Sequence, residues 1–432
     1  MTESTPAAGA GDGYRRLLAR LGQVRSQGVS LGLERVHLAL ERVGHPELHV
    51  PAVHIAGTNG KGSCAALSDS ILRKGGFRTG LFTSPHLLRF TERIRVDGQE
   101  IDGDHLAALD VAVAATGVPL TYFEVSTVLA FLAFAEAKVD VAVLETGLGG
   151  RLDATSACHP LVCAITSIAL DHEAILGRTI PEIAFEKASI ARPGVPLFVG
   201  PLVPEAERRV LEVAGAAGAK VLRPGIDYPP APAPPALVGR HQLANAALAV
   251  AISRHAAVAL GRPVADDAVL QGLADVRWPG RLERIGDVLF DCAHNVEGTQ
   301  ALVAALPESP RRVLVTSIVR DKNAAGMLAV LAPHFDRVVV TRSPSERALD
   351  PAELARLVGP TRGQGSANAP DVECVASPGD ALASARAYAR ETAGGLVVVA
   401  GSIFLVGALR AMLLDAGVGA GRTVMDASDP LP

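Results

Sequence analysis

The residues from Gly57 to Ser63 have the side chains and the spacing that bind phosphate groups. Backbone N–H groups of a glycine-rich turn, and the positive end of the helix that follows it, attract an anion. A lysine such as Lys61 would reach the outer phosphates of a nucleotide, and the hydroxyl of Ser63 could hold Mg²⁺. The candidate phosphate-binding residues are Gly57, Thr58, Asn59, Gly60, Lys61, Gly62 and Ser63.

The spacing of these glycines departs from the usual phosphate-loop pattern. Only two residues separate Gly57 from Gly60, and Gly62 stands between Lys61 and Ser63. The apolar run 51–56 and the helical spacing of apolar residues over 64–73 predict a strand before the turn and a helix after it. From the pattern alone, a tight strand-to-helix turn without a ligand stays open as the alternative.

Polar side chains follow further apolar runs, where parallel strands would end. Ser84 follows the run 77–83, Glu145 ends the run that starts at 139, and His172 follows the run 161–168. In an open parallel sheet, ligands bind at the carboxyl ends of the strands. Because an unpaired buried carboxylate is costly, Glu145 would meet Mg²⁺ there. The alternatives are a helix cap for Ser84, a solvated acid for Glu145 and a structural role for His172.

A lysine occurs inside a helix predicted over 180–191. Lys187 lies between the apolar residues Phe185 and Ile190. An ordinary surface charge is one interpretation. In the other, burial lowers the pKa of the amine, and the neutral amine reacts with CO₂ to give a carbamate. The sequence leaves both open.

Composition limits the class of protein. The chain has 432 residues, 49% hydrophobic and 20% charged, which is enough for two or three globular domains. The formal net charge of -4 argues against a nucleic-acid-binding surface. The 5 cysteines form no CxxC pair, so we expect reduced thiols rather than zinc or disulfides. Without a signal peptide or a long apolar stretch, we expect a cytoplasmic protein that does not bind a membrane.

Strands and helices alternate along the chain, which predicts an α/β fold with two domains. We expect a P-loop-type ATPase domain with a mostly parallel sheet over 13–281 and a smaller Rossmann-like α/β domain over 282–425. Residues 1–12 are expected to be a disordered N-terminus and residues 426–432 a tail. Trp278 to Glu283 have the glycine and proline content of a domain junction.

Seven motifs occur in an order and spacing that resemble one family. They are LGLERV at 31–36, AGTNGKGS at 56–63, TSPHLLRFTERIRV at 83–96, ETGLGGRLDAT at 145–155, HQLANAA at 241–247, and then WPGRLE and DCAHN. Together they are similar to the bacterial folylpolyglutamate synthase/dihydrofolate synthase family of the Mur ligase superfamily. The resemblance runs from about Leu31 through the second domain. Two positions depart from it, because Ser156 and Ser189 stand where that family usually has Asn and Gly.

The resemblance implies an activity. Such an enzyme joins L-glutamate to dihydropteroate, or to the glutamate tail of a folate, through an acyl phosphate made with ATP. It releases ADP and phosphate, uses two Mg²⁺ ions and acts as a monomer on small molecules. A Mur-type ligase of UDP-sugars is one alternative, although those enzymes carry an extra N-terminal domain. A nucleotide-binding switch without ligase activity is the other.

The resemblance also implies roles for individual residues. The metal ligands would be Ser84, Glu145, His172 and a carbamylated Lys187, and the last three would act in catalysis together with Lys61. Besides the phosphate loop, the residues that reach ATP would be Asn245, Arg281, Asp291 and His294. The pterin site would be lined by Val29, Thr121, Tyr122, Phe123, Glu124, Leu152, Asp153 and Ala154.

Overall fold

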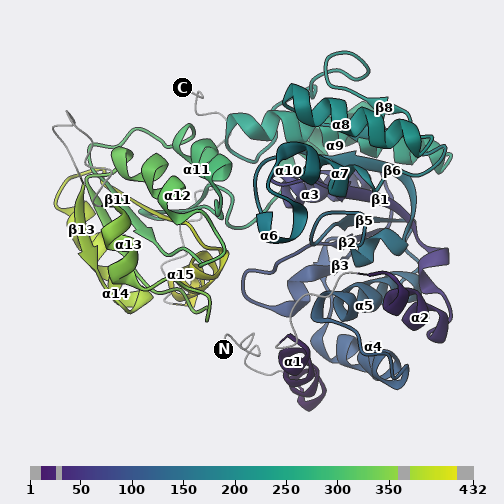
Figure 1. The fold of residues 1–432 in the computed structure, drawn as a ribbon, viewed down its shortest axis with the longest axis horizontal. Helices are drawn as coiled ribbons and strands as arrows, with labels where there is room; N and C mark the ends of the chain where they lie inside the picture. Colours follow the sequence, from purple (N-terminus) through teal and green to yellow (C-terminus); the bar gives the residue numbers. More distant parts are fainter. Residues whose placement is uncertain (1–10, 26–31, 359–369, 416–432) are drawn as a thin grey trace. The chain divides into compact units, whose positions relative to one another are not determined.

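The computed structural model describes residues 11–25, 32–358 and 370–415, which fall into two compact units (Figure 1). The first unit holds the chain up to Ala236 and Gln242–Arg277, and the second holds Leu237–His241 and the chain from Trp278 onward. Val29 and the expected tail at 426–432 lie outside the described residues, as do residues 1–10 of the expected disordered N-terminus.

The first unit is built on an eight-stranded sheet with the strand order β4-β3-β2-β5-β1-β6-β7-β8. The six strands from β2 to β8 in this order pair in parallel, and β3 and β4 are antiparallel at one edge. The strands are β1 Pro51–Ala56, β2 Thr79–Phe82, β3 Ile94–Val96, β4 Gln99–Glu100, β5 Val141–Glu145, β6 His159–Ile165, β7 Leu197–Val199 and β8 Val221–Leu222. The apolar run of β5 is buried throughout, as expected for a central parallel strand.

Helices connect these strands and cover the sheet. They are α1 Asp12–Arg25, α2 Glu34–Arg42, α3 Lys61–Lys74, α4 Gly103–Ala115, α5 Tyr122–Glu136, α6 Glu173–Leu176, α7 Ile180–Ala188, α8 Pro204–Ala216, α9 Arg240–Ala259 and α10 Asp266–Asp275. Helix α3 follows β1 directly and contacts β1, β2 and β5. The phosphate-loop residues therefore lie at the carboxyl end of a central strand.

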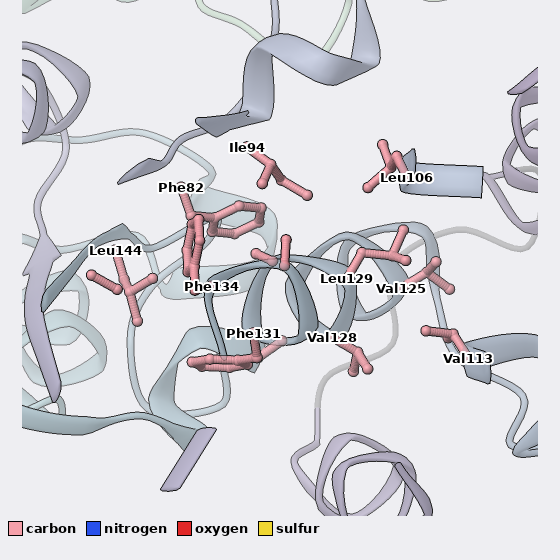
Figure 2. Close-up of a cluster of buried hydrophobic side chains, with 14 of the residues drawn as sticks. Phe82, Ile94, Leu106, Val113, Val125, Val128, Leu129, Phe131, Phe134 and Leu144 are labelled. Carbon is pink, nitrogen blue, oxygen red and sulfur yellow. The ribbon is translucent and has the colours of Figure 1, made fainter. Parts of the chain in front are cut away.

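A core cluster of the first unit forms around α5 and side chains of the sheet (Figure 2). Apolar residues of α5 pack against side chains of β2 and β5, and residues of β3 and α4 close the cluster. Each such side chain contributes roughly 2 kcal/mol by burial. The labelled members are Phe82, Ile94, Leu106, Val113, Val125, Val128, Leu129, Phe131, Phe134 and Leu144.

The second unit has its own sheet with the order β13-β12-β11-β14-β10-β9, parallel except for β9. The strands are β9 Glu283–Ile285, β10 Val288–Phe290, β11 Arg312–Thr316, β12 Arg337–Val340, β13 Asp371–Cys374 and β14 Leu396–Ala400. The helices are α11 Val296–Val303, α12 Ala324–Leu331, α13 Pro351–Val358, α14 Pro378–Arg390 and α15 Ile403–Asp415. The predicted α/β fold, with a mostly parallel first sheet and a second α/β domain, is confirmed.

Two predicted elements are shorter in the structure. The strand predicted over 161–168 ends at Ile165, because the side chains of Thr166 and Ser167 bond to the phosphate loop. The helix predicted over 180–191 ends at Ala188, with Ser189 as its C-cap. Within the described ranges, no helix combines the length and the apolar character needed to cross a membrane.

Candidate active site

The phosphate-loop residues form a turn that only glycine can make at two places. Gly57 has φ 148° and Gly60 has φ 85°. A Cβ atom on Gly57 would collide with the hydroxyl of Thr166, and one on Gly60 would lie 2.5 Å from Asn245 Oδ1. Both the positive φ and the close approach therefore require glycine.

Hydrogen bonds fix this turn to the segment that follows β6. The N–H of Thr58 donates to the carbonyl of Ser167 over 2.8 Å, and the hydroxyl of Thr166 donates to the carbonyl of Asn59 over 2.6 Å. The N–H of Ala169 donates to the Thr58 hydroxyl over 3.0 Å. Sequence analysis did not identify Thr166 and Ser167 as site residues. Their position directly after an apolar run, where a parallel strand would end, was the signal that could have identified them.

Helix α9 supports the start of α3 with two amide side chains. Gln242 is buried, and its Nε2 donates to Ser63 Oγ over 3.4 Å. Asn245 Nδ2 donates to Gln242 Oε1 over 2.9 Å. Lys61 Nζ donates to the carbonyl of Thr58 over 3.1 Å, so the lysine lies over the turn. Gln242 belongs to the HQLANAA motif, but sequence analysis did not identify it as a site residue.

Glu145 lies at the carboxyl end of β5, beside the phosphate loop. It pairs in register with Ile55 of β1, and only 5% of its surface is exposed. Its Oε2 accepts a hydrogen bond from the N–H of Ser84 over 3.0 Å. The structure thus brings together two of the four expected metal ligands, and the solvated-acid alternative for Glu145 is wrong.

Lys187 is also buried, with 4% of its surface exposed. Its Nζ donates to the carbonyl oxygen of Gly57 over 2.8 Å, at the first residue of the phosphate loop. The surface-charge alternative is therefore wrong. The hydroxyl of Ser189 donates to the carbonyl of Phe185 over 2.7 Å, so this serine is accommodated at the end of α7.

The described residues contain no group of three or more His, Cys, Asp or Glu side chains that could hold a metal by themselves. Mg²⁺ at a nucleotide site does not need one, because substrate phosphates and waters supply most of its ligands. The carboxylate of Glu145 and the hydroxyls of Ser84 and Ser63 fit such a site. His172 lies at the N-cap of α6 with φ 52°.

The residues expected to line a pterin site lie at the start of α5. Thr121 and Glu124 form a capping box, in which the Thr121 N–H donates to Glu124 Oε2 over 2.7 Å. Glu124 is buried and also pairs with Arg35 over 2.7 Å. The Phe123 ring lies 5.7 Å from the Phe82 ring, and the guanidinium of Arg93 lies 5.1 Å from the Tyr122 ring. Glu124 and Thr121 therefore stabilise the helix that presents Tyr122 and Phe123.

The other expected pterin residues follow Glu145 in the chain. Asp153 is buried, and burial raises the pKa of its carboxyl group. Its Oδ2 accepts hydrogen bonds from the N–H groups of Gly147 and Leu148 over 2.9 and 2.8 Å. Leu152 precedes it, and Ala154 begins a short 3₁₀ helix, Ala154–Ala157. Ser156 donates to the carbonyl of Gly150 over 2.6 Å, which accommodates a serine there.

Three expected ATP contacts lie in the second unit. Asp291 follows β10 and accepts hydrogen bonds from the N–H groups of Leu282 and Ala293 over 3.0 and 2.8 Å. Burial raises the pKa of Asp291, and the nearby charge of Arg281 opposes that rise. His294 Nδ1 lies 2.9 Å from the carbonyl of Cys292, so Nδ1 carries the proton. Arg281, Asp291 and His294 are thus grouped in one unit, whereas Asn245 lies with the phosphate loop in the other.

Comparisons with known proteins show which proteins this chain is similar to. Residues 280–403 match the family described as "Mur ligase, glutamate ligase domain". A Mycobacterium tuberculosis dihydrofolate synthase/folylpolyglutamate synthase is 36% identical over 438 residues, which cover 88% of this chain and 89% of that protein. A Haloferax volcanii relative, a probable bifunctional folylpolyglutamate synthase/dihydropteroate synthase, is 35% identical over 92% of this chain. This chain spans only 50% of the length of that relative.

Solved structures share the fold. Escherichia coli FolC in complex with DHPP and ADP has a TM-score of 0.84 and 33% identity, covering 94% of this chain and 99% of that one. A bifunctional folylpolyglutamate synthase/dihydrofolate synthase from Yersinia pestis, complexed with AMPPNP and a Mn ion, has a TM-score of 0.81 and 31% identity. That match covers 93% of this chain and 98% of the other.

Proposed function

Because this chain belongs to the folylpolyglutamate synthase/dihydrofolate synthase family of the Mur ligase superfamily, we propose that it is an ATP-dependent ligase that joins L-glutamate to a pteroate or folate acceptor. The observation that carries the proposal is Lys187, a buried lysine bonded to the first residue of the phosphate loop. A nucleotide-binding switch has no need of a buried amine at that place. The relatives do not favour the UDP-sugar alternative.

In the proposed reaction, the γ-phosphoryl group of ATP moves to the carboxylate of the acceptor and gives an acyl phosphate. The amine of L-glutamate then attacks the carbonyl carbon, and phosphate leaves. The N–H groups of the phosphate loop and Lys61 bind the phosphate oxygens and hold them in place. Mg²⁺, when bound, neutralises charge on the transferring group.

The metal site is proposed in two parts. Glu145 and Ser84 would hold the first Mg²⁺, which their contact supports. His172 and a carbamylated Lys187 would hold the second. Burial of Lys187 supports the carbamate, because desolvation favours the neutral amine that reacts with CO₂. A Mn ion in the Yersinia pestis complex supports a divalent cation in the family.

The remaining roles are proposed on the resemblance. Asn245, Arg281, Asp291 and His294 would contact ATP. The acceptor would lie against Tyr122 and Phe123 and against residues 152–154. We propose that the protein acts on small molecules as a cytoplasmic monomer, without nucleic acid or membrane. The net charge of -4 supports the absence of nucleic acid, and the free cysteines, four of them buried, support a reducing compartment.

Phosphate release by the purified protein tests the function. The assay contains Mg-ATP and L-glutamate, with dihydropteroate in one reaction and tetrahydrofolate in another. We expect glutamate-dependent release with both acceptors, which would make the enzyme bifunctional. Phosphate release with only one acceptor would show that the enzyme has only the activity that uses this acceptor. ATP binding without release in either reaction would contradict the proposed function.

A further inference from the structure

A series of buried hydrogen bonds connects β1 to the segment after Glu145. His54, in β1, is fully buried, and its Nε2 lies 2.8 Å from the Thr155 hydroxyl. That hydroxyl donates to Asp153 Oδ1 over 2.6 Å, and the N–H of Thr155 reaches the same oxygen over 3.1 Å. The other oxygen of Asp153 accepts from the N–H groups of Gly147 and Leu148. His54 and Thr155 are 101 residues apart in the sequence.

The directions of these hydrogen bonds assign the proton on His54. Three of the four groups that reach Asp153 are backbone N–H donors, and the Thr155 hydroxyl also donates to it, so the Asp153 carboxyl group acts as an acceptor at both oxygens. The single proton of the Thr155 hydroxyl is then directed at Asp153. His54 Nε2 must therefore carry a proton and donate to Thr155. Its Nδ1 has no hydrogen-bond partner in the part of the chain that the structure describes.

Burial keeps this histidine neutral. It lowers the pKa of His54 to about 3, with a smaller effect from the charge of Arg192. Burial raises the pKa of the Asp153 carboxyl group, and the hydrogen bonds from Thr155, Leu148 and Gly147 oppose that rise. Loss of any donor would leave a buried acceptor incompletely paired.

The series begins and ends at residues that matter for the proposed reaction. His54 precedes the phosphate loop by three residues in the same strand region. Gly147 and Leu148 follow Glu145 closely, and Gly147 contacts Phe123. A Cβ atom on Gly147 would lie 2.6 Å from the Phe123 ring. The position of the Gly147 backbone therefore limits where the Phe123 ring can lie.

We propose that His54 and Thr155 are positioning residues for the acceptor: they orient Asp153, which holds the backbone of Gly147 and Leu148 against Phe123. This inference rests on the proposed function for the identity of the acceptor. Neither residue needs to touch a substrate. Their effect is to keep residues 147–153 in the conformation that binds the acceptor while the nearby phosphate loop stays unchanged.

Two substitutions at one position test the proposal. Thr155→Val keeps the branched shape but removes the hydroxyl, whereas Thr155→Ser keeps the hydroxyl. Ser253→Ala is the control, because Ser253 Oγ is buried and has no hydrogen-bond partner among the described residues. Steady-state kinetics give KM for the acceptor, ATP and L-glutamate, and amide hydrogen exchange follows the peptide that contains Gly147 and Leu148. Thermal unfolding checks that each variant is folded.

We expect Thr155→Val, which removes both hydrogen bonds of the hydroxyl group, to raise KM for the acceptor about tenfold and to leave KM for ATP within about twofold. Exchange of the Gly147 and Leu148 amides should become faster. Thr155→Ser should restore both values, and Ser253→Ala should match wild type. His54→Leu, which removes the donor at the other end, should act in the same direction as Thr155→Val.

Three results would overturn the inference. Unchanged amide exchange in folded Thr155→Val would show that the series does not hold Gly147 and Leu148. Faster exchange with an unchanged acceptor KM, or an equal rise in KM for ATP, would exclude the acceptor role. If wild-type protein releases no phosphate with either acceptor, the proposed function fails, and the amide exchange still tests the hydrogen-bond series.

Discussion

The Nζ atom of Lys187 lies 2.8 Å from the carbonyl oxygen of Gly57, although the two residues are 130 positions apart in the sequence. A buried amine is costly unless it has a polar partner or becomes chemically modified. Its contact with Gly57 would place it beside the reacting groups of the proposed reaction. Lys187 is therefore the first residue to test.

We predict that Lys187→Ala nearly abolishes turnover, by about 10³-fold, while the fold stays intact. A small carboxylate added to the assay should restore part of the rate, because it can take the place of the proposed carbamate. Phosphate release and circular dichroism would be measured together. Lys220→Ala, at an exposed lysine, is the control and should keep the wild-type rate. Wild-type rates in Lys187→Ala would contradict the assignment.

Glu145→Ala should remove the Mg²⁺-dependent activity. Its carboxylate is buried beside Ser84, and no other described acid is expected to replace it at the phosphates. Phosphate release would be followed as a function of Mg²⁺ concentration. Glu136→Ala, which removes an exposed acid at the end of α5, should leave that curve unchanged. If Glu145→Ala responds to Mg²⁺ as wild type does, the proposed metal site is wrong.

Gly60→Ala should weaken ATP binding at least about tenfold. The added Cβ would lie 2.5 Å from Asn245 Oδ1, so the loop or α9 must shift. Gly44→Ala is a matched control: Gly44 has φ 86° against 85° for Gly60, but its Cβ would meet nothing within 4 Å. Both variants carry a backbone cost of ~1 kcal/mol. Calorimetric titration with a non-hydrolysable ATP analogue separates the two effects, and equal affinities would show that crowding at Asn245 does not matter.

His54 should make the protein less stable as the pH falls. Because burial lowers the pKa of His54 from its ordinary value of 6.5 to about 3, the unfolded chain binds a proton in this interval that the folded protein does not. The free energy of unfolding should therefore fall by about 1.4 kcal/mol per pH unit, from below pH 6.5 down to about 3. This contribution is fully present above pH 6.5.

Urea unfolding of His54→Gln at a series of pH values checks this. The variant should lose that slope relative to wild type, whatever its stability at pH 7. His37→Gln, at an exposed histidine, should keep the wild-type dependence. Parallel curves for wild type and His54→Gln would mean that His54 titrates equally in both states.

The sequence predicted the local parts of the site better than the contacts between them. The apolar run that ends at Glu145 defined β5, because a central parallel strand is apolar on both faces. The sequence could not show that Ser84 contacts Glu145 through its backbone N–H group rather than through its hydroxyl group. Every residue except proline has a backbone N–H group, so the residue type does not indicate which N–H group donates to Glu145.

Residues that act over long separations were the hardest to assign. The helix pattern alone allowed Lys187 to be buried or exposed, since Glu186 precedes it and apolar residues lie on both sides of the pair. In the sequence, His54 is a single polar residue within an apolar strand. Its partner Thr155 belongs to a distant segment, so the sequence did not indicate their contact. The strand β6 was predicted too long, because the bonds that turn Thr166 away from the sheet run to Asn59.

The position of β1 between β5 and β6 has a consequence for synthesis of the protein on the ribosome. Residues 51–63 emerge early, but the strands that flank β1 end only at Glu145 and Ile165, and Asn245 follows much later. A nascent chain that has emerged only through α3 has neither neighbouring strand nor the partners of its phosphate loop. Nucleotide binding must therefore begin late in translation, and until then the apolar β1 is available to molecular chaperones.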